Sequence, residues 1–271
     1  MQIHGAHGYL VSQFLSPLSN LRDDDWGGDP QRRMRFLLEI VRATRRAVGA
    51  DFAVSVKLNS ADFQKGGFSF DDAADVVRAL EREGVDLIEV SGGTYEAPAM
   101  VGGGRKAQDV PAQRASTVAR EAYFLEAAKV FRAATRVPLM LTGGMRSARW
   151  MAEALESGAV DVAGIARPMA SEPALPARLL ADPEAAARPV RLATGIRKLD
   201  SLLEIYWHML QLHRMGDGQD VDPGLSRFRA ILHAVAMTWT HRPKKTPAGP
   251  TVAAPPAVAA SPAPQLAGVP A

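Results

Sequence analysis

The strongest constraint on the fold is a repeated alternation between a short apolar run and a longer amphipathic stretch. The apolar runs show no clean polar–apolar alternation, which is typical of strands buried on both faces, as in a parallel sheet covered by helices. The sequence predicts strands at residues 1–5, 52–59, 85–93, 137–144 and 160–167, and helices at residues 30–49, 70–84, 120–135 and 147–158. The predicted fold class is therefore α/β, built from about five βα units.

The turns after these strands are polar or rich in glycine, for example KLNSADF after the second strand and TGGMR after the fourth. In parallel βα folds, binding and catalytic sites are built at the carboxyl ends of the strands. We therefore expect the functional residues to lie together at one edge of the sheet.

Composition excludes several classes of function. The chain has no cysteine, which rules out disulfides, thiolate catalysis and cysteine-ligated metal clusters on this chain. Its formal charge is only +3 and no run of Lys or Arg resembles a nucleic-acid-binding patch, so we expect no nucleic-acid partner. No signal peptide is recognisable, and no apolar run reaches the roughly 20 residues of a membrane span. The predicted location is cytoplasmic.

The regular alternation stops near residue 170, and the rest of the chain has a different character. Residues 189–242 are predicted to form a helical extension. Residues 243–271 are rich in Pro and Ala, and we expect them to be disordered because they cannot bury enough apolar area. The predicted organisation is thus 1–188, 189–242 and 243–271.

Two imidazoles and a phenol lie within six positions at the start of the chain, at His4, His7 and Tyr9. Imidazoles can donate hydrogen bonds to a substrate oxygen, and a phenol can deliver a proton. Two other interpretations remain open. The pair could bind a metal, although no third ligand is evident and residues i and i+3 of a strand point to roughly opposite sides. The two histidines could also be purely structural.

Longer motifs around this cluster resemble a known family. The run IHGAHGYLVSQFLSPLSN (3–20), followed by RDDDWGG (22–28) and RRMRF (32–36), is similar to the FMN-dependent old yellow enzyme family of NADH:flavin oxidoreductases. EAYFLEAA (121–128), LTGG (141–144) and VDVAGIAR (160–167) follow in the order of that family. The resemblance covers roughly residues 1–180 and implies a TIM-type (β/α)8 barrel. Trp26 and the arginines of RRMRF are interpreted as structural, closing the loop and placing charges on a helix face.

The resemblance implies roles for the cluster residues. His4 and His7 correspond to the pair that hydrogen-bonds a substrate carbonyl oxygen, and Tyr9 corresponds to the proton donor. No side chain can carry a hydride, so a cofactor must do so. The expected reaction passes hydride from NADH or NADPH through FMN to a small substrate with an activated, enone-like alkene.

The resemblance also implies cofactor contacts. Lys57 stands where the family usually has an Arg beside the pyrimidine side of the flavin, and either cation would stabilise negative charge there. The expected phosphate contacts follow the last two predicted strands, where backbone N–H groups and one guanidinium suit a phosphate. They are Gly143, Gly144, Ala166 and Arg167, with Ala166 in place of the usual Gly.

In the family, the strand that carries the histidine pair is the fourth of eight, whereas here it opens the chain. We therefore expect an N-terminally truncated barrel of about five βα units with open sheet edges. Such a chain would self-associate into a homo-oligomer or depend on a complementing chain, and would bind flavin weakly by itself. The alternative function is a non-catalytic half-barrel remnant or complementing subunit without bound flavin.

Two other enzyme classes fit the sequence less well. The 2,4-dienoyl-CoA reductase branch of the family carries an iron–sulfur cluster, which a chain without cysteine cannot ligate. A lyase or aldolase on a similar barrel would need a Schiff-base lysine at a strand end, for which Lys57 is the only candidate. The HGAHGY motif favours the flavin enzyme over a lyase or aldolase.

Overall fold

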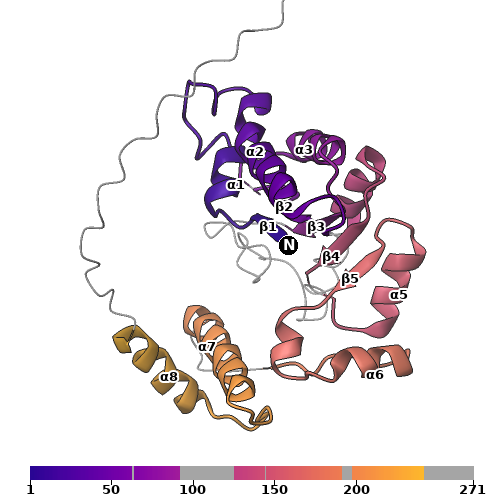
Figure 1. Ribbon diagram of the computed structural model, residues 1–271. Helices are drawn as coiled ribbons and strands as arrows, with labels where there is room; N and C mark the ends of the chain where they lie inside the picture. Colours follow the sequence, from indigo (N-terminus) through magenta and orange to yellow (C-terminus); the bar gives the residue numbers. More distant parts are fainter. Residues whose placement is uncertain (63, 92–124, 144, 191–196, 241–271) are drawn as a thin grey trace, which may run out of the picture.

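A parallel five-stranded sheet forms the centre of the computed structural model (Figure 1). The structure describes residues 1–62, 64–91, 125–143, 145–190 and 197–240. The strand order follows the sequence: β1 (Gln2–Gly5), β2 (Ser55–Asn59), β3 (Leu87–Ser91), β4 (Leu139–Thr142) and β5 (Val162–Gly164). The predicted parallel α/β architecture is confirmed for these residues, and each predicted strand is present but shorter than expected.

The last strand shows the largest difference from the prediction. The sequence pattern extended this strand to Arg167, whereas β5 ends at Gly164 and Arg167 opens the short 3-10 helix η2 (Arg167–Ala170). Pro168 lies in this segment and has no backbone N–H to donate to a strand ladder, which favours the turn over a longer strand.

Helices follow the strands as predicted, with local signals that fix their starts. Asp29 caps α2 (Pro30–Val48) by accepting a hydrogen bond from the Arg32 backbone N–H at 2.9 Å. Ser69 caps α3 (Phe70–Arg82) in a capping box with Asp72, which is a pattern recognisable from sequence. Residues 125–134 are helical, and α5 (Ala148–Glu156) begins after its cap Ser147.

These helices pack on one face of the sheet, and the apolar core lies between them. The core includes fully buried side chains of the sheet, namely Val56, Leu58, Ile88, Val90, Leu139 and Leu141. Helical side chains pack against them, namely Leu37, Val41, Val77, Leu80 and Phe131. Alternate residues of each strand point to opposite faces, so the residues between these positions face the other side of the sheet.

Three short helical segments were missed by the sequence pattern. They are α1 (Leu10–Leu15), η2 and α6 (Leu175–Ala181). Each has seven residues or fewer, which is too short for a 3.6-residue periodicity to be visible. Helix α1 is important for the site because it directly follows the histidine cluster.

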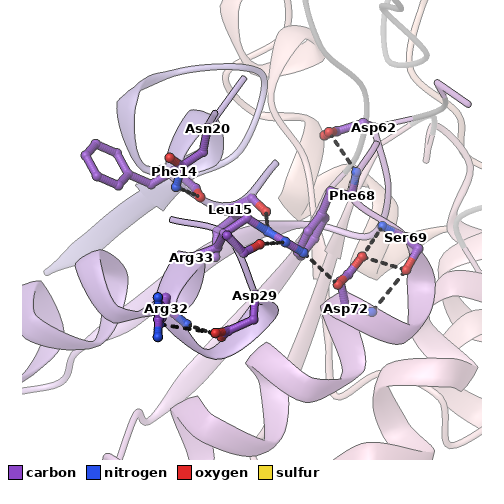
Figure 2. A network of polar contacts seen from close by, with 11 residues as sticks. Phe14, Leu15, Asn20, Asp29, Arg32, Arg33, Asp62, Phe68, Ser69 and Asp72 are labelled. Carbon is purple, nitrogen blue, oxygen red and sulfur yellow. Dashed lines mark hydrogen bonds and ion pairs between the residues drawn. The ribbon is translucent and has the colours of Figure 1, made fainter. Parts of the chain in front are cut away.

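The segment between α1 and α2 is held by a buried arginine (Figure 2). Arg33, only 7% exposed, donates hydrogen bonds to the carbonyl oxygens of Leu15 (3.0 Å) and Gly28 (2.6 Å) and forms an ion pair with Asp72 (3.1 Å). Arg33 is therefore structural, as interpreted from the sequence, but it lies buried between segments and is not a charge on an exposed helix face. Its guanidinium satisfies carbonyl groups at the end of α1 and before α2, and so joins α1, α2 and α3.

The same segment is closed by polar contacts from its own residues. The Asn20 side chain donates to the carbonyl oxygens of Phe14 (2.8 Å) and Trp26 (2.7 Å). The Arg35 guanidinium lies 4.8 Å from the centre of the Trp26 ring, a cation–π contact. The long motif at residues 13–36 is thus largely a structural device that fixes the chain after the histidine cluster.

Two helices, α7 (Arg197–Gly216) and α8 (Arg227–Thr240), lie in the predicted helical extension (Figure 1). They pack against each other around a small cluster of their own, which contains Trp207, Leu225 and Ala230. No helix in the described part of the chain combines the length and the apolar character needed to cross a membrane. The predicted disordered tail, residues 243–271, lies outside the described residues, and the three-part organisation stays a prediction.

Candidate active site

The histidine cluster lies at the carboxyl end of β1, where the chain turns sharply into α1. His7 adopts a left-handed backbone conformation with φ of 62°, and Gly8 follows with φ of 76°. Such a φ is uncommon for a residue other than glycine and needs support from its surroundings. That support comes from β2 and β3: the His7 backbone N–H donates to Asn59 Oδ1 at 3.1 Å, and His7 Nε2 lies 2.9 Å from Ser91 Oγ.

This turn brings the three predicted catalytic side chains together. The His4 ring centre lies 5.2 Å from that of His7 and 5.2 Å from that of Tyr9. The expectation that positions 4 and 7 point to opposite sides was therefore wrong. The strand ends at Gly5, and the positive φ of His7 returns its side chain to the side of His4.

Exposure differs across the cluster. Tyr9 is 46% exposed, while His7 is intermediate and touches Ser91. A phenol at the open side of two imidazoles can reach a bound molecule without being buried itself. Within the described residues there is no group of three or more His, Cys, Asp or Glu side chains placed to hold a metal ion.

Lys57 lies next to His4 across the sheet. The strand register pairs His4 of β1 with Lys57 of β2, and Lys57 with Glu89 of β3. Lys57 Nζ forms an ion pair with Glu89 Oε1 at 2.7 Å, and the two side chains are only 15% and 6% exposed. Lys57 is therefore part of a partly buried charged row on the face of the sheet opposite the apolar core.

Glu89 was missed by the sequence analysis, although it is central to this row. Its second carboxylate oxygen accepts a hydrogen bond from the Gln2 side chain at 2.8 Å, and the Thr142 side chain also bonds the carboxylate. Two signals could have revealed it: a charged residue interrupts the apolar run VDLIEV, and its place in that strand matches the place of Lys57 in FAVSVKLN. Asn59 comes two residues after Lys57, and Ser91 comes two residues after Glu89. Both of these residues support His7.

The electrostatics of the row favour neutral imidazoles. Burial and the nearby Lys57 ammonium lower the pKa of His4, and burial, Lys57 and His4 lower the pKa of His7 to about 4. Burial alone would raise the pKa of Glu89. The hydrogen bond and the charge of Lys57, together with hydrogen bonds from Thr142 and Gln2, hold this pKa below its ordinary value. At neutral pH the row therefore contains a carboxylate, an ammonium and two neutral imidazoles.

The predicted phosphate contacts lie at the ends of β4 and β5. Gly143 follows β4 directly, and Ala166 is the residue before η2. Arg167 is 44% exposed at its side chain and forms an ion pair with Glu204 of α7 at 3.4 Å. Gly144 lies outside the described residues.

The two groups of candidate residues come from different strands: His4 and Lys57 lie on β1 and β2, whereas Gly143, Ala166 and Arg167 follow β4 and β5. Neighbouring strands lie about 4.8 Å apart, so three spacings separate Lys57 on β2 from the end of β5 by about 14 Å. The arrangement offers one cation beside two hydrogen-bonding imidazoles and, further along, a guanidinium with backbone N–H groups. Such a pair of sites suits an elongated ligand with an electron-accepting ring at one end and an anionic group at the other.

Comparison with known proteins identifies the family that the sequence motifs resemble. The sequence profile of the NADH:flavin oxidoreductase / NADH oxidase family matches residues 1–184. The match covers the five strands, their helices and α6. It ends before α7 and α8.

Individual relatives carry related descriptions. The chain is 40% identical over 185 residues to the NADH-dependent flavin oxidoreductase iliE of Neonectria sp. (strain DH2), covering 68% of this chain and 24% of that protein. It is 42% identical over 180 residues to the protein of the same name from Hypocrea jecorina (strain QM6a), covering 65% and 43%. Among solved structures, a 2-naphthoyl-CoA reductase complex is similar with a TM-score of 0.58 and 26% identity, covering 68% and 27%. The chain thus spans less than half of the length of each of these relatives.

Proposed function

The chain belongs to the NADH:flavin oxidoreductase / NADH oxidase family, and from that premise we propose that it acts in an FMN-dependent oxidoreductase that takes hydride from NADH or NADPH. We further propose that the acceptor is a small molecule with an activated, enone-like alkene. The proposal is based on the proximity of three side chains at the carboxyl end of β1. The ring centres of His7 and Tyr9 each lie 5.2 Å from the ring centre of His4.

The residues present fit FMN by their chemistry. A reduced flavin carries negative charge on its ring, and Lys57 supplies a fixed ammonium on the same face as the imidazoles. The phosphate requires a cation and backbone N–H groups, for which Arg167, Ala166 and Gly143 are proposed, with Gly144 as an additional contact from the sequence. FMN would supply the hydride transfer that no side chain can perform.

The imidazoles are proposed to bind the substrate carbonyl oxygen. Because burial and Lys57 lower the pKa values of His4 and His7, both rings are neutral at pH 7 and each offers one N–H donor. Two donors aimed at one oxygen stabilise the negative charge that develops there as the alkene is reduced. The contact of His7 with Ser91 Oγ orients its ring.

Tyr9 is proposed to deliver the proton that completes the reduction. Its ring lies beside that of His4 and is almost half exposed, so a substrate held by the imidazoles would lie within its reach. The phenol would protonate the carbon next to the carbonyl group, whereas the imidazoles would donate hydrogen bonds to the carbonyl oxygen.

The test is an absorbance titration of the purified chain with excess FMN, followed by anaerobic addition of NADH and, in parallel, NADPH. We expect a saturable shift of the flavin bands, bleaching by one of the two nucleotides, and recovery of the oxidised spectrum when cyclohexenone is added. Binding is expected to be weak enough that gel filtration removes part of the flavin.

Free FMN with the same nucleotides is the control, because it reports any direct reaction. The variant Tyr9→Phe should still be bleached by the nucleotide but should re-oxidise slowly with cyclohexenone. A folded chain that leaves the flavin spectrum unchanged at every FMN concentration would contradict the proposal.

A further inference from the structure

We infer that Glu89 is a positioning residue of the site: its carboxylate holds the Lys57 ammonium beside His4 and balances its charge. This inference rests on the proposed function, because it assigns Lys57 the cofactor side of the site. It adds a residue that holds Lys57 and affects the imidazoles by its charge, without a hydrogen bond to either ring.

The first argument is the geometry of the pair. A lysine side chain has a flexible stem, and in solvent its ammonium has no fixed place. Here the Lys57 ammonium lies 2.7 Å from Glu89 Oε1, with 15% and 6% of the two side chains exposed. Lys57 and Glu89 are also direct neighbours in the strand register, so the ammonium is held over the sheet next to His4.

The second argument is that Glu89 is itself fixed from several strands. Gln2 of β1 donates to its second oxygen at 2.8 Å, and Thr142 of β4 bonds it from the other side. A carboxylate with these three partners spans β1 to β4 and has little freedom to move. The position of Lys57 is therefore set by the sheet and not by its own side-chain rotamers.

The third argument is the charge that the site would have without Glu89. Lys57 and Glu89 act on both imidazoles with opposite sign, Lys57 lowering and Glu89 raising their pKa values. Without the carboxylate, the ammonium would be an unbalanced charge on a half-buried face. Glu89 thus sets how strongly Lys57 acts on the imidazoles and on any flavin beside them.

A purely structural role is the competing explanation, since one carboxylate that joins four strands also stabilises the sheet. The two roles differ in what they predict. If Glu89 only joins the strands, replacing it lowers the free energy of unfolding and leaves the pKa values of the imidazoles unchanged. If it positions Lys57 and balances its charge, replacing it also changes the titration of His4 and His7. The test must therefore measure the imidazoles directly.

The experiment follows the ring proton signals of His4 and His7 by NMR through a pH titration of the full chain, without flavin, assigned with His4→Gln and His7→Asn variants. Glu89→Gln keeps the length of the side chain and removes its charge. We expect the titrations of both histidines to move to lower pH in this variant. Glu83→Gln is the matched control, because Glu83 also forms an ion pair with a cationic side chain, that of Arg42, but lies on the outer helical layer.

The second readout is the midpoint potential of bound FMN. Reduction adds negative charge beside Lys57, so removing the opposing carboxylate should raise the potential in Glu89→Gln and leave it unchanged in Glu83→Gln. If FMN does not bind, the proposed function fails while the imidazole titration still tests the inference. The two failures are therefore distinguishable.

The inference would be overturned if Glu89→Gln lowers the melting temperature but the titrations of His4 and His7 stay at the same pH as in the parent chain. If this variant does not fold, the double variant Lys57→Met/Glu89→Gln replaces the ion pair with neutral side chains of similar size. Lys57 is the stronger influence on both rings, so their titrations should then move to higher pH. Unchanged titrations in the double variant would equally contradict the inference.

Discussion

The two faces of the sheet are built from the same five strands but have opposite chemistry. One face carries Val56, Leu58, Ile88 and Val90, all fully buried under the helices. The other face carries Lys57, Asn59, Glu89 and Ser91, which lie at the positions between them. Each strand therefore contributes alternately to the core and to the candidate site.

Because the two faces present different side chains, we expect that the packing of the core can be changed without changing the charge at the site. Lys57 and Leu58 are neighbours in the chain, yet one belongs to the charged row and the other to the apolar core. A substitution of Leu58 should lower the stability and leave the titrations of the imidazoles unchanged. The predictions below test this separation, beginning with the largest expected effect.

Leu58→Ala should produce the largest loss of stability. Leu58 is fully buried in the core, and replacing a buried leucine with alanine costs about 3–5 kcal/mol because apolar contacts are lost and a cavity remains. The free energy of unfolding is measured by urea denaturation. The histidine titrations of the folded fraction should stay as in the parent chain; if they shift, the faces are not independent.

Lys57→Met should destabilise the chain by about 3 kcal/mol, because a buried carboxylate loses its partner. Glu89 keeps its bonds to Gln2 and Thr142, which limit the loss. Urea denaturation of this variant and of Lys57→Met/Glu89→Gln gives the contrast. The double variant should recover most of the stability, and equal loss in both would show that the charge of Glu89 is not the cause.

Stability should fall as the pH drops from about 6.5 to about 4, the ordinary and the lowered pKa of His7. In this window the unfolded chain binds protons that the folded chain refuses, so acid favours unfolding. His7→Asn should reduce the slope, and asparagine tolerates the left-handed backbone of this position. The remaining slope comes from His4, His208 and His233, whose pKa values burial also lowers. Urea midpoints at several pH values measure the effect, and an unchanged slope in His7→Asn would contradict it.

Ser69→Ala should have the smallest effect, a loss of about 1 kcal/mol, because α3 loses its N-terminal cap. Ser147→Ala removes the corresponding cap of α5 and serves as a second example on the same helical layer. Thermal unfolding with circular dichroism measures both. A change in the His7 titration in either variant would show that the helical layer reaches the polar face.

Much of the fold could be predicted from sequence because the strands and long helices carry strong local signals. The capping box at Ser69 and the proline at the start of α2 are examples. The strand ends were less accurate because hydrophobicity alone does not mark where the ladder stops, as at Gly164. The strands were interpreted as buried on both faces, and the polar row became visible only when the register was known.

The candidate site could be predicted only where a motif marked it. His4, His7 and Tyr9 are close in the sequence, so their meeting depends on one turn. Glu89 lies 32 residues after Lys57 and 87 after Gln2, and only the pairing of three strands brings these residues together. Likewise, the sequence indicated a structural role for Arg33 but not its three partners, which come from separate segments (Figure 2).

The carboxylate shared between four strands has an evolutionary consequence. A lineage that replaces Glu89 alone leaves an ammonium without its counter-charge, and a lineage that replaces Lys57 alone leaves a buried carboxylate. Because replacing one partner alone costs more stability than replacing both, we expect the two positions to change together. The charge of this site is thus a property of the sheet as a whole, and we expect a cation at position 57 wherever position 89 carries a carboxylate.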